Sequence, residues 1–178
     1  DRSPSRGLGD VYKRQTWFPA MKLIPIQMEN RVFIGIDPGI SGGIAIIYND
    51  TYTVKKCPNT IQEMADVLIT LKDHAPNLPM YCVIEKVHSF PGNSGKSMFT
   101  FGSNYGQWLG ILATLRIPYI EVIPNKWMKY FGSMPRDKTD RKNHIKHLAQ
   151  QRYPNVKITL ATSDAMLIAH YLKETNIQ

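Results

Sequence analysis

A short apolar segment that ends in an acid is the feature that most constrains how this chain can fold. Residues 32–36 read Val-Phe-Ile-Gly-Ile, an apolar and largely β-branched run that is typical of a buried strand. Asp37-Pro38-Gly39 follows directly, and this combination is typical of a turn. The pattern therefore predicts that the carboxylate of Asp37 is held at the edge of a sheet, beside a flexible backbone.

Two further acids are predicted in comparable positions. Glu85 lies near the end of a second apolar strand, predicted over residues 81–87, and Asp164 opens an apolar helix near the end of the sequence. Three carboxylates on rigid elements can bind a hard divalent cation, and without the cation they would raise one another's pKa values. Each acid also has a structural explanation: a turn for Asp37, a distant ion pair for Glu85 and the helix dipole for Asp164.

The order of the predicted elements indicates an α/β fold with a mixed five-stranded sheet flanked by helices. Three strands joined by short connections are predicted first, over residues 31–37, 42–48 and 51–56. The later strands are predicted over 81–87 and 118–122, and the helices over 60–74, 97–115, 124–131, 139–152 and 164–172. Since the first and fourth strands are expected neighbours and the last helix can pack across their ends, we expect the three acids to lie close together.

Charge and composition restrict the function classes. The chain has 178 residues, which suits one domain with a hydrophobic core, and a formal net charge of +8. This charge favours a polyanionic partner, although a merely basic protein fits the charge alone equally well. No apolar run approaches the roughly 20 residues that span a bilayer, so no membrane partner is expected. Two cysteines without a secretory signal predict a reducing compartment.

The first 20 residues differ from the rest. Residues 1–20 lack periodicity, and Asp-Val-Tyr-Lys-Arg-Gln at 10–15 resembles an in-frame translation of a sequencing-library adapter. We therefore interpret residues 1–20 as a non-native leader, expect the natural start at Met21 or Met28, and assign residues 21–178 to a single domain.

The motifs around the three acids match a known family. Ile-Gly-Ile-Asp-Pro-Gly at 34–39, Val-Ile-Glu-Lys-Val at 83–87 and Ser-Asp-Ala at 163–165 together resemble the RuvC family of Holliday junction resolvases. The segments at 90–92, 96–102 and 105–108 make the phage-type branch the more similar one. The resemblance runs from about Val32 to Tyr171.

The resemblance implies an RNase H-like fold, a homodimer, and Mg²⁺- or Mn²⁺-dependent cutting of four-way DNA junctions, with one nick per subunit. It implies that Asp37, Glu85 and Asp164 hold two metal ions, and that the protein works in the cytoplasm of a bacterium or of a phage-infected host cell. The family carries a further acid or a histidine one helical turn before the last aspartate, whereas this sequence has Leu-Ala-Thr at 160–162. The fourth ligand is therefore absent, replaced by water or supplied from elsewhere.

The resemblance also implies contacts with DNA. The family places an aromatic residue just after the strand-four acid, where it meets unpaired bases; the matching position is His88, with Phe90 nearby, and either could stack on a base. Packing under the loop is the alternative for Phe90, and a metal-ligand or general-base role is the alternative for His88. Family lysines contact phosphate near the cut, and Lys138 is the first candidate for this catalytic group. The predicted phosphate contacts are Lys96, Lys126, Lys129, Lys138, Arg141, Lys142 and Lys146, although those on the helix could equally form a solvated face.

Three other functions fit parts of the pattern. A flap or branched-DNA nuclease would use the same fold on another substrate, and a non-catalytic junction-binding relative would explain the missing fourth acid. An actin-like kinase or ATPase also opens with an Asp-x-Gly hairpin, but that fold usually needs well over 178 residues. The glycine-rich helix over 97–115 could form the dimer interface or pack in the core.

Overall fold

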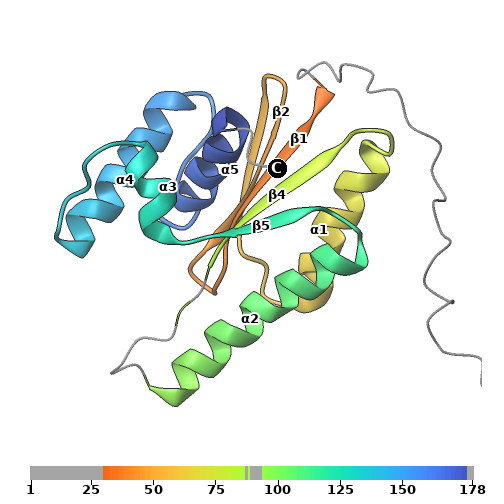
Figure 1. Ribbon diagram of the computed structural model, residues 1–178, viewed down its shortest axis with the longest axis horizontal. Helices are drawn as coiled ribbons and strands as arrows, with labels where there is room; N and C mark the ends of the chain where they lie inside the picture. The colour runs from red at the N-terminus through yellow and green to blue at the C-terminus, as the bar shows by residue number, and fades with distance from the viewer. Residues whose placement is uncertain (1–29, 87, 89–93, 176–178) are drawn as a thin grey trace, which may run out of the picture.

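A mixed sheet of five strands forms the centre of the computed structural model, which describes residues 30–86, 88 and 94–175 (Figure 1). The strands are β1 (Val32–Asp37), β2 (Gly43–Tyr48), β3 (Thr51–Lys56), β4 (Met80–Glu85) and β5 (Tyr119–Val122). Their order across the sheet is β3-β2-β1-β4-β5, with β1 antiparallel to β2 and parallel to β4. The predicted mixed sheet, and the pairing of the first and fourth strands, are confirmed.

Helices cover both faces of the sheet (Figure 1). The helices are α1 (Ile61–His74), α2 (Gly95–Thr114), α3 (Pro124–Tyr130), α4 (Lys138–Arg152) and α5 (Ser163–Thr175). Alternate residues of β1 divide between two cores: Ile34 and Ile36 pack with residues of α1 and α2, whereas Phe33 packs with residues of α3, α4 and α5. The sheet is therefore the middle of three layers.

Helix α5 crosses the centre of the sheet and lies over β1, β2 and β4. Gly35 allows this close approach, because a Cβ atom at this position would lie 2.2 Å from the carbonyl oxygen of Ala165 and 2.4 Å from the amide nitrogen of Ala169. The glycine between two buried isoleucines in β1 is therefore explained by the helix that packs on it.

Three details of the helices refine the picture that the sequence gives. Ile61 begins α1 and is 54% exposed, whereas Met64 and Leu68 on the same helix are buried. Helix α5 begins at Ser163, one residue before the predicted helix over 164–172. A Cβ atom at Gly102, Gly106 or Gly110 of α2 would meet nothing within 4 Å, so core packing does not explain this stripe.

Two predictions fall outside the described residues: Phe90 as a base-stacking residue, and residues 1–20 as a leader. Within the described ranges, none of the helices is both long enough and apolar enough to cross a membrane.

Candidate active site

Asp37 is the last residue of β1, and a tight turn folds back onto it. Gly39 has a φ of +113°, which favours glycine, and its carbonyl oxygen accepts a hydrogen bond from the amide of Gly42 at 2.9 Å. A Cβ atom at Gly42 would lie 2.1 Å from the carbonyl oxygen of Asp37 and 3.1 Å from its carboxyl carbon. The Pro-Gly turn therefore packs directly against the acid that precedes it.

Glu85 is the last residue of β4, the parallel neighbour of β1, so both acids lie at the same edge of the sheet. The indole Nε1–H of Trp127 donates a hydrogen bond to Glu85 Oε2 at 2.7 Å. Trp127 is fully buried on α3, the short helix after β5. The helix packs against α5 and thereby presents its only buried residue to the acid.

Asp164 is the second residue of α5 and lies half-buried in its first turn. The hydroxyl of Ser163 donates a hydrogen bond to Asp164 Oδ1 at 3.2 Å. A negative charge in the first turn of a helix is also favoured by the helix dipole, which is the structural explanation that the sequence offers for Asp164. Since α5 lies over β1 and β4, its first turn brings this third acid to the two strand ends.

The three carboxylates affect one another's ionisation. Burial raises the pKa of Asp37 well above its ordinary value, and the charges of Asp164 and Glu85 raise it further. Burial also raises the pKa of Glu85 to about 7, against the hydrogen bond from Trp127, with Asp164 adding to the rise. The pKa of Asp164 is raised as well, again mainly by burial. The structure therefore brings together the three acids that the sequence singled out.

The lysine whose charge acts on this cluster is Lys142, half-buried on α4. Its charge lowers the pKa values of Asp37, Glu85 and Asp164 and so opposes the effect of burial. Lys138, ranked first from the sequence, lies exposed at the start of the same helix. Lys142 lies one helical turn after Lys138 on α4, and it was also among the predicted DNA contacts.

The donor set suits a hard divalent cation. Carboxylate oxygens are the ligands that Mg²⁺ and Mn²⁺ prefer, and a bound cation would favour the ionised forms that burial disfavours. Among the residues that the structure describes, no three His, Cys, Asp or Glu side chains are already arranged as a metal site. Binding would therefore require the carboxylates to turn toward the ion, and the hydrogen bond from Trp127 engages one oxygen of Glu85, Oε2.

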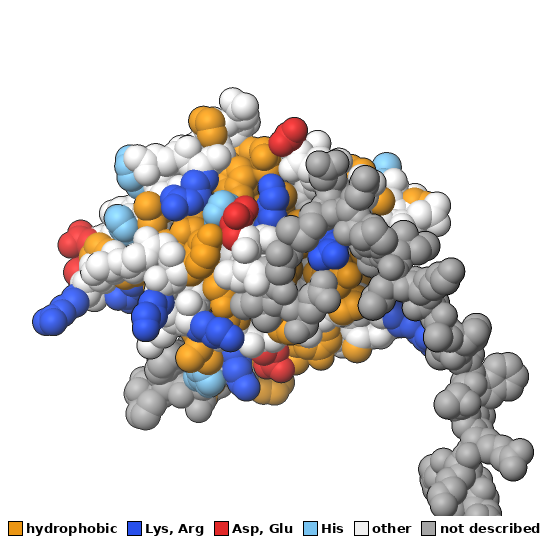
Figure 2. Space-filling model, turned by 45° about the horizontal axis from the view of Figure 1, so that its top comes forward, with side chains coloured by type: hydrophobic (Ala, Val, Ile, Leu, Met, Phe, Trp, Pro, Cys, Tyr) orange, Lys and Arg blue, Asp and Glu red, His pale blue; other side chains and the backbone are white. Residues whose placement is uncertain are grey.

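The other predicted DNA contacts within the described residues lie on the surface of the molecule. His88 is exposed just after β4, and Lys96 is exposed in the first turn of α2. Lys126 and Lys129 are exposed on α3, and Lys146 is exposed on α4. Figure 2 shows Lys and Arg side chains over the left part of the molecule, where α3 and α4 lie in Figure 1.

Arg141 has a local structural role. Its Nη1 donates hydrogen bonds to the carbonyl oxygens of Pro135 and Arg136, at 3.3 and 3.1 Å. Its charge also lowers the pKa of Asp164. Arg141 therefore fixes the segment that leads into α4, beside the acid cluster.

Sequence reasoning placed Trp127 on a short helix but gave it no role. The available signal was Glu85 itself, because a buried carboxylate needs a hydrogen-bond donor and an indole N–H is one. Nothing in the local sequence identifies which donor that is.

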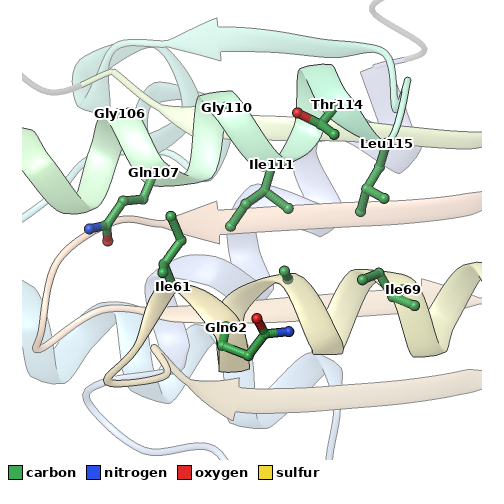
Figure 3. A pocket seen from close by; sticks show the side chains of 10 residues that line it. Ile61, Gln62, Ile69, Gly106, Gln107, Gly110, Ile111, Thr114 and Leu115 are labelled. Atoms are coloured by element: carbon green, nitrogen blue, oxygen red, sulfur yellow. The ribbon is translucent and has the colours of Figure 1, made fainter.

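A groove lies apart from the acids, between α1 and α2 (Figure 3). It has a volume of about 610 Å³, and its lining carries no charged side chain. The lining residues are Ile61, Gln62, Ala65, Ile69, Gly106, Gln107, Gly110, Ile111, Thr114 and Leu115. This apolar surface belongs to the opposite face of the sheet from α5.

Comparisons with known proteins show the fold. No protein-family model and no curated protein matches this sequence. Among solved structures, Thermus thermophilus RuvC in complex with a Holliday junction substrate matches with a TM-score of 0.57 and 12% identity, over 81% of this chain and 95% of that chain. A second structure of Thermus thermophilus RuvC matches with a TM-score of 0.57 and 14% identity, over 82% and 96%. The predicted RNase H-like fold of the RuvC type is thus confirmed.

Proposed function

We propose that this protein is a divalent-metal-dependent endonuclease that resolves four-way DNA junctions by paired nicks. One observation carries the proposal: three partly buried carboxylates from β1, β4 and α5 converge beside Lys142. Burial raises the pKa values of all three, and neighbouring acids raise those of Asp37 and Glu85 further. Acids brought together in this way are costly to the fold, and such costs are typical of functional sites. The RuvC-type fold and the net charge of +8 support DNA as the substrate.

In this proposal Asp37, Glu85 and Asp164 hold Mg²⁺ or Mn²⁺, with two ions per active site. When bound, such ions lower the pKa of a coordinated water and offset charge on the leaving oxygen. Trp127 fixes the orientation of Glu85 through one oxygen. Lys142 favours the ionised forms of all three acids and attracts the phosphate group to be cut.

The exposed basic residues would bind the DNA arms. Lys96, Lys126, Lys129, Lys138 and Lys146 are exposed and positively charged, and phosphate contacts made by such residues give salt-dependent affinity. His88, exposed directly after β4, is the described candidate for stacking on an unpaired base. The motifs at 96–102 and 105–108 support a phage-type enzyme, which would act in the cytoplasm of a bacterium or of an infected cell.

Paired nicking needs a second active site, and we propose that the α1–α2 groove is the homodimer interface. Its lining is uncharged, so two copies of net charge +8 can meet there without bringing like charges into contact. Phe99 is 78% exposed, and its spacing places it on the stripe of Gly102, Gly106 and Gly110, where a partner backbone can approach closely. The two helices are about 20–30 Å long, and a standard specific interface buries about 800 Å² per partner.

The catalytic proposal is tested by cleavage and binding assays on the same DNA. With Mg²⁺, the wild-type protein should nick a four-way junction faster than a flap, a duplex or a single strand. Asp37→Asn and Glu85→Gln should abolish cleavage while junction binding persists. If the double variant cuts at the wild-type rate, the proposal is wrong.

Other outcomes would identify the alternatives. Preferential cutting of flaps would indicate a branched-DNA nuclease of the same fold. Tight junction binding without any metal-dependent nick would indicate a non-catalytic relative, and ATP turnover would favour an actin-like enzyme.

The dimer proposal is tested separately by placing a charge in the groove. Gly106→Lys should give a monomer in analytical ultracentrifugation, because the lysine would be buried against a partner. The folded monomer should still nick one strand of a four-way junction, but it should no longer make the paired nick in the second strand. If Gly106→Lys dimerises as well as the wild type, the groove is not the interface.

A further inference from the structure

The turn after Asp37 is held from the opposite layer of the molecule. The buried amide of Gly39 donates a hydrogen bond to Asn104 Oδ1 at 2.7 Å. Asn104 lies on α2, is 8% exposed, and is one of the few polar side chains buried in the described part of the chain. The side chain therefore joins α2 to the turn that follows the first acid.

A second contact fixes the other end of the turn. The amide of Cys57, directly after β3, donates a hydrogen bond to the carbonyl oxygen of Gly42 at 2.9 Å. The Nδ2 group of Asn104 in turn donates to Cys57 Sγ at 3.4 Å. Asn104 thus contacts one end of the turn directly and the other end through Cys57.

Side-chain packing adds to these hydrogen bonds. Phe101, one turn before Asn104 on the same face of α2, lies so close to Gly39 that a Cβ atom there would be 2.9 Å from its ring. Gly42 is packed equally closely against the backbone and the carboxyl carbon of Asp37. Since the turn touches both α2 and Asp37, any movement of the turn changes the position of the acid.

We propose that Asn104 is a positioning residue for the Asp37 carboxylate, acting through the Gly39 amide and the turn over residues 38–42. The inference rests on the proposed function, since positioning matters only if Asp37 binds a metal ion. Residues that orient metal ligands typically change metal affinity by 10- to 100-fold when they are replaced. Asn104 would make α2 part of the metal site, although the helix covers the other face of the sheet from α5.

The test compares Asn104→Ala with Asn104→Asp. Alanine leaves the Gly39 amide without its acceptor, whereas aspartate keeps an acceptor oxygen of nearly the same shape. In the absence of DNA, Mn²⁺ affinity measured by electron paramagnetic resonance should fall about tenfold or more in Asn104→Ala. Hydrogen exchange at the Gly39 amide should accelerate in the same variant. Asn104→Asp should restore both the protection of this amide and most of the Mn²⁺ affinity.

A matched control separates positioning from general destabilisation. Leu112 is fully buried on the same helix, in the core that α2 forms with α1, so Leu112→Ala should lower the melting temperature. Below that temperature its Mn²⁺ affinity and its Gly39 protection should equal those of the wild type.

Two results have distinct meanings. If folded Asn104→Ala binds Mn²⁺ as tightly as the wild type, Asn104 is only structural and the inference is overturned. If the wild-type protein itself binds no Mn²⁺, the proposed metal site is wrong, and the inference fails with it.

Discussion

Replacing Glu85 with Gln should stabilise the metal-free protein above neutral pH, even though it removes cleavage. Burial raises the pKa of Glu85 in the folded protein to about 7, from an ordinary value of 4.5. Between these two pH values the folded protein holds a proton that the unfolded chain releases. Stability must therefore fall as the pH rises through this range, and the loss is complete above the folded pKa.

The size of the effect follows from the two pKa values. At 1.36 kcal/mol per pKa unit, the difference corresponds to about 3 kcal/mol, discounted somewhat because Glu85 is not fully buried. Gln is uncharged and still offers an oxygen to the indole N–H of Trp127, so the variant keeps the contact without the cost. The variant also removes the charge that raises the pKa of Asp37, which adds to the stabilisation.

Urea unfolding with a chelator present, at pH 4.5 and pH 8, measures this effect. We expect the two proteins to differ little at pH 4.5, and Glu85→Gln to be more stable at pH 8 by about 3 kcal/mol, or roughly 6–12 °C in melting temperature. Glu174→Gln is the control, because this acid is exposed near the end of α5. If wild type and Glu85→Gln lose stability equally between the two pH values, the carboxylate is compensated and the reasoning is refuted.

Three shorter predictions follow from the same geometry. Lys142→Ala should shift the rising limb of the cleavage pH profile to higher pH, because it removes a charge that lowers the pKa values of Asp37, Glu85 and Asp164. Lys138→Ala should instead weaken DNA binding in a salt-dependent way and leave the pH profile in place. Trp127→Phe should likewise raise the pKa of Glu85 and shift the profile upward, since the lost N–H favours the ionised form. Gly35→Ala should destabilise the fold by about 3 kcal/mol or more in urea unfolding, because the new Cβ atom would overlap the backbone of α5.

The sheet and the positions of the three acids at the ends of its elements could be predicted from the sequence, because both depend on short local patterns of residues. Apolar runs of strand length fixed β1 and β4, and Asp37 and Glu85 stand at their ends. Strand order then followed from short connections and from the crossover helices. The boundaries of these strands agree with the structure to within two residues.

The partners of the acids could not be predicted in the same way. Trp127, Lys142 and Asn104 lie on three different helices, and each reaches the site through a tertiary contact. Helical spacing says which residues share a face, but the rotation of that face toward a neighbouring layer depends on packing that periodicity does not encode. Lys138 and Lys142 share one stripe of α4, so only the three-dimensional placement distinguishes them.

The position of the missing fourth acid has a structural counterpart. Residues 160–162 form a turn before α5 rather than its first helical turn, and Leu160 is 44% exposed. A Cβ atom at Gly43 of β2 would lie 2.6 Å from the carbonyl oxygen of Ala161, so this turn packs tightly against the sheet. The turn before α5 therefore carries no acid, and the cluster has three members among the residues that the structure describes.

This number limits how many ions the protein can bind alone. Three ionised carboxylates carry a charge of −3, Lys142 acts on all of them, and Arg141 acts on Asp164. One divalent cation is enough to neutralise the remainder, and a second would leave excess positive charge until a DNA phosphate arrives. We therefore expect one tightly bound Mn²⁺ per chain without DNA, and a second only when a cleavage-defective variant that keeps all three carboxylates is saturated with junction DNA. Two equally tight ions in the free wild-type protein would show that a further ligand, outside these three acids, completes the site.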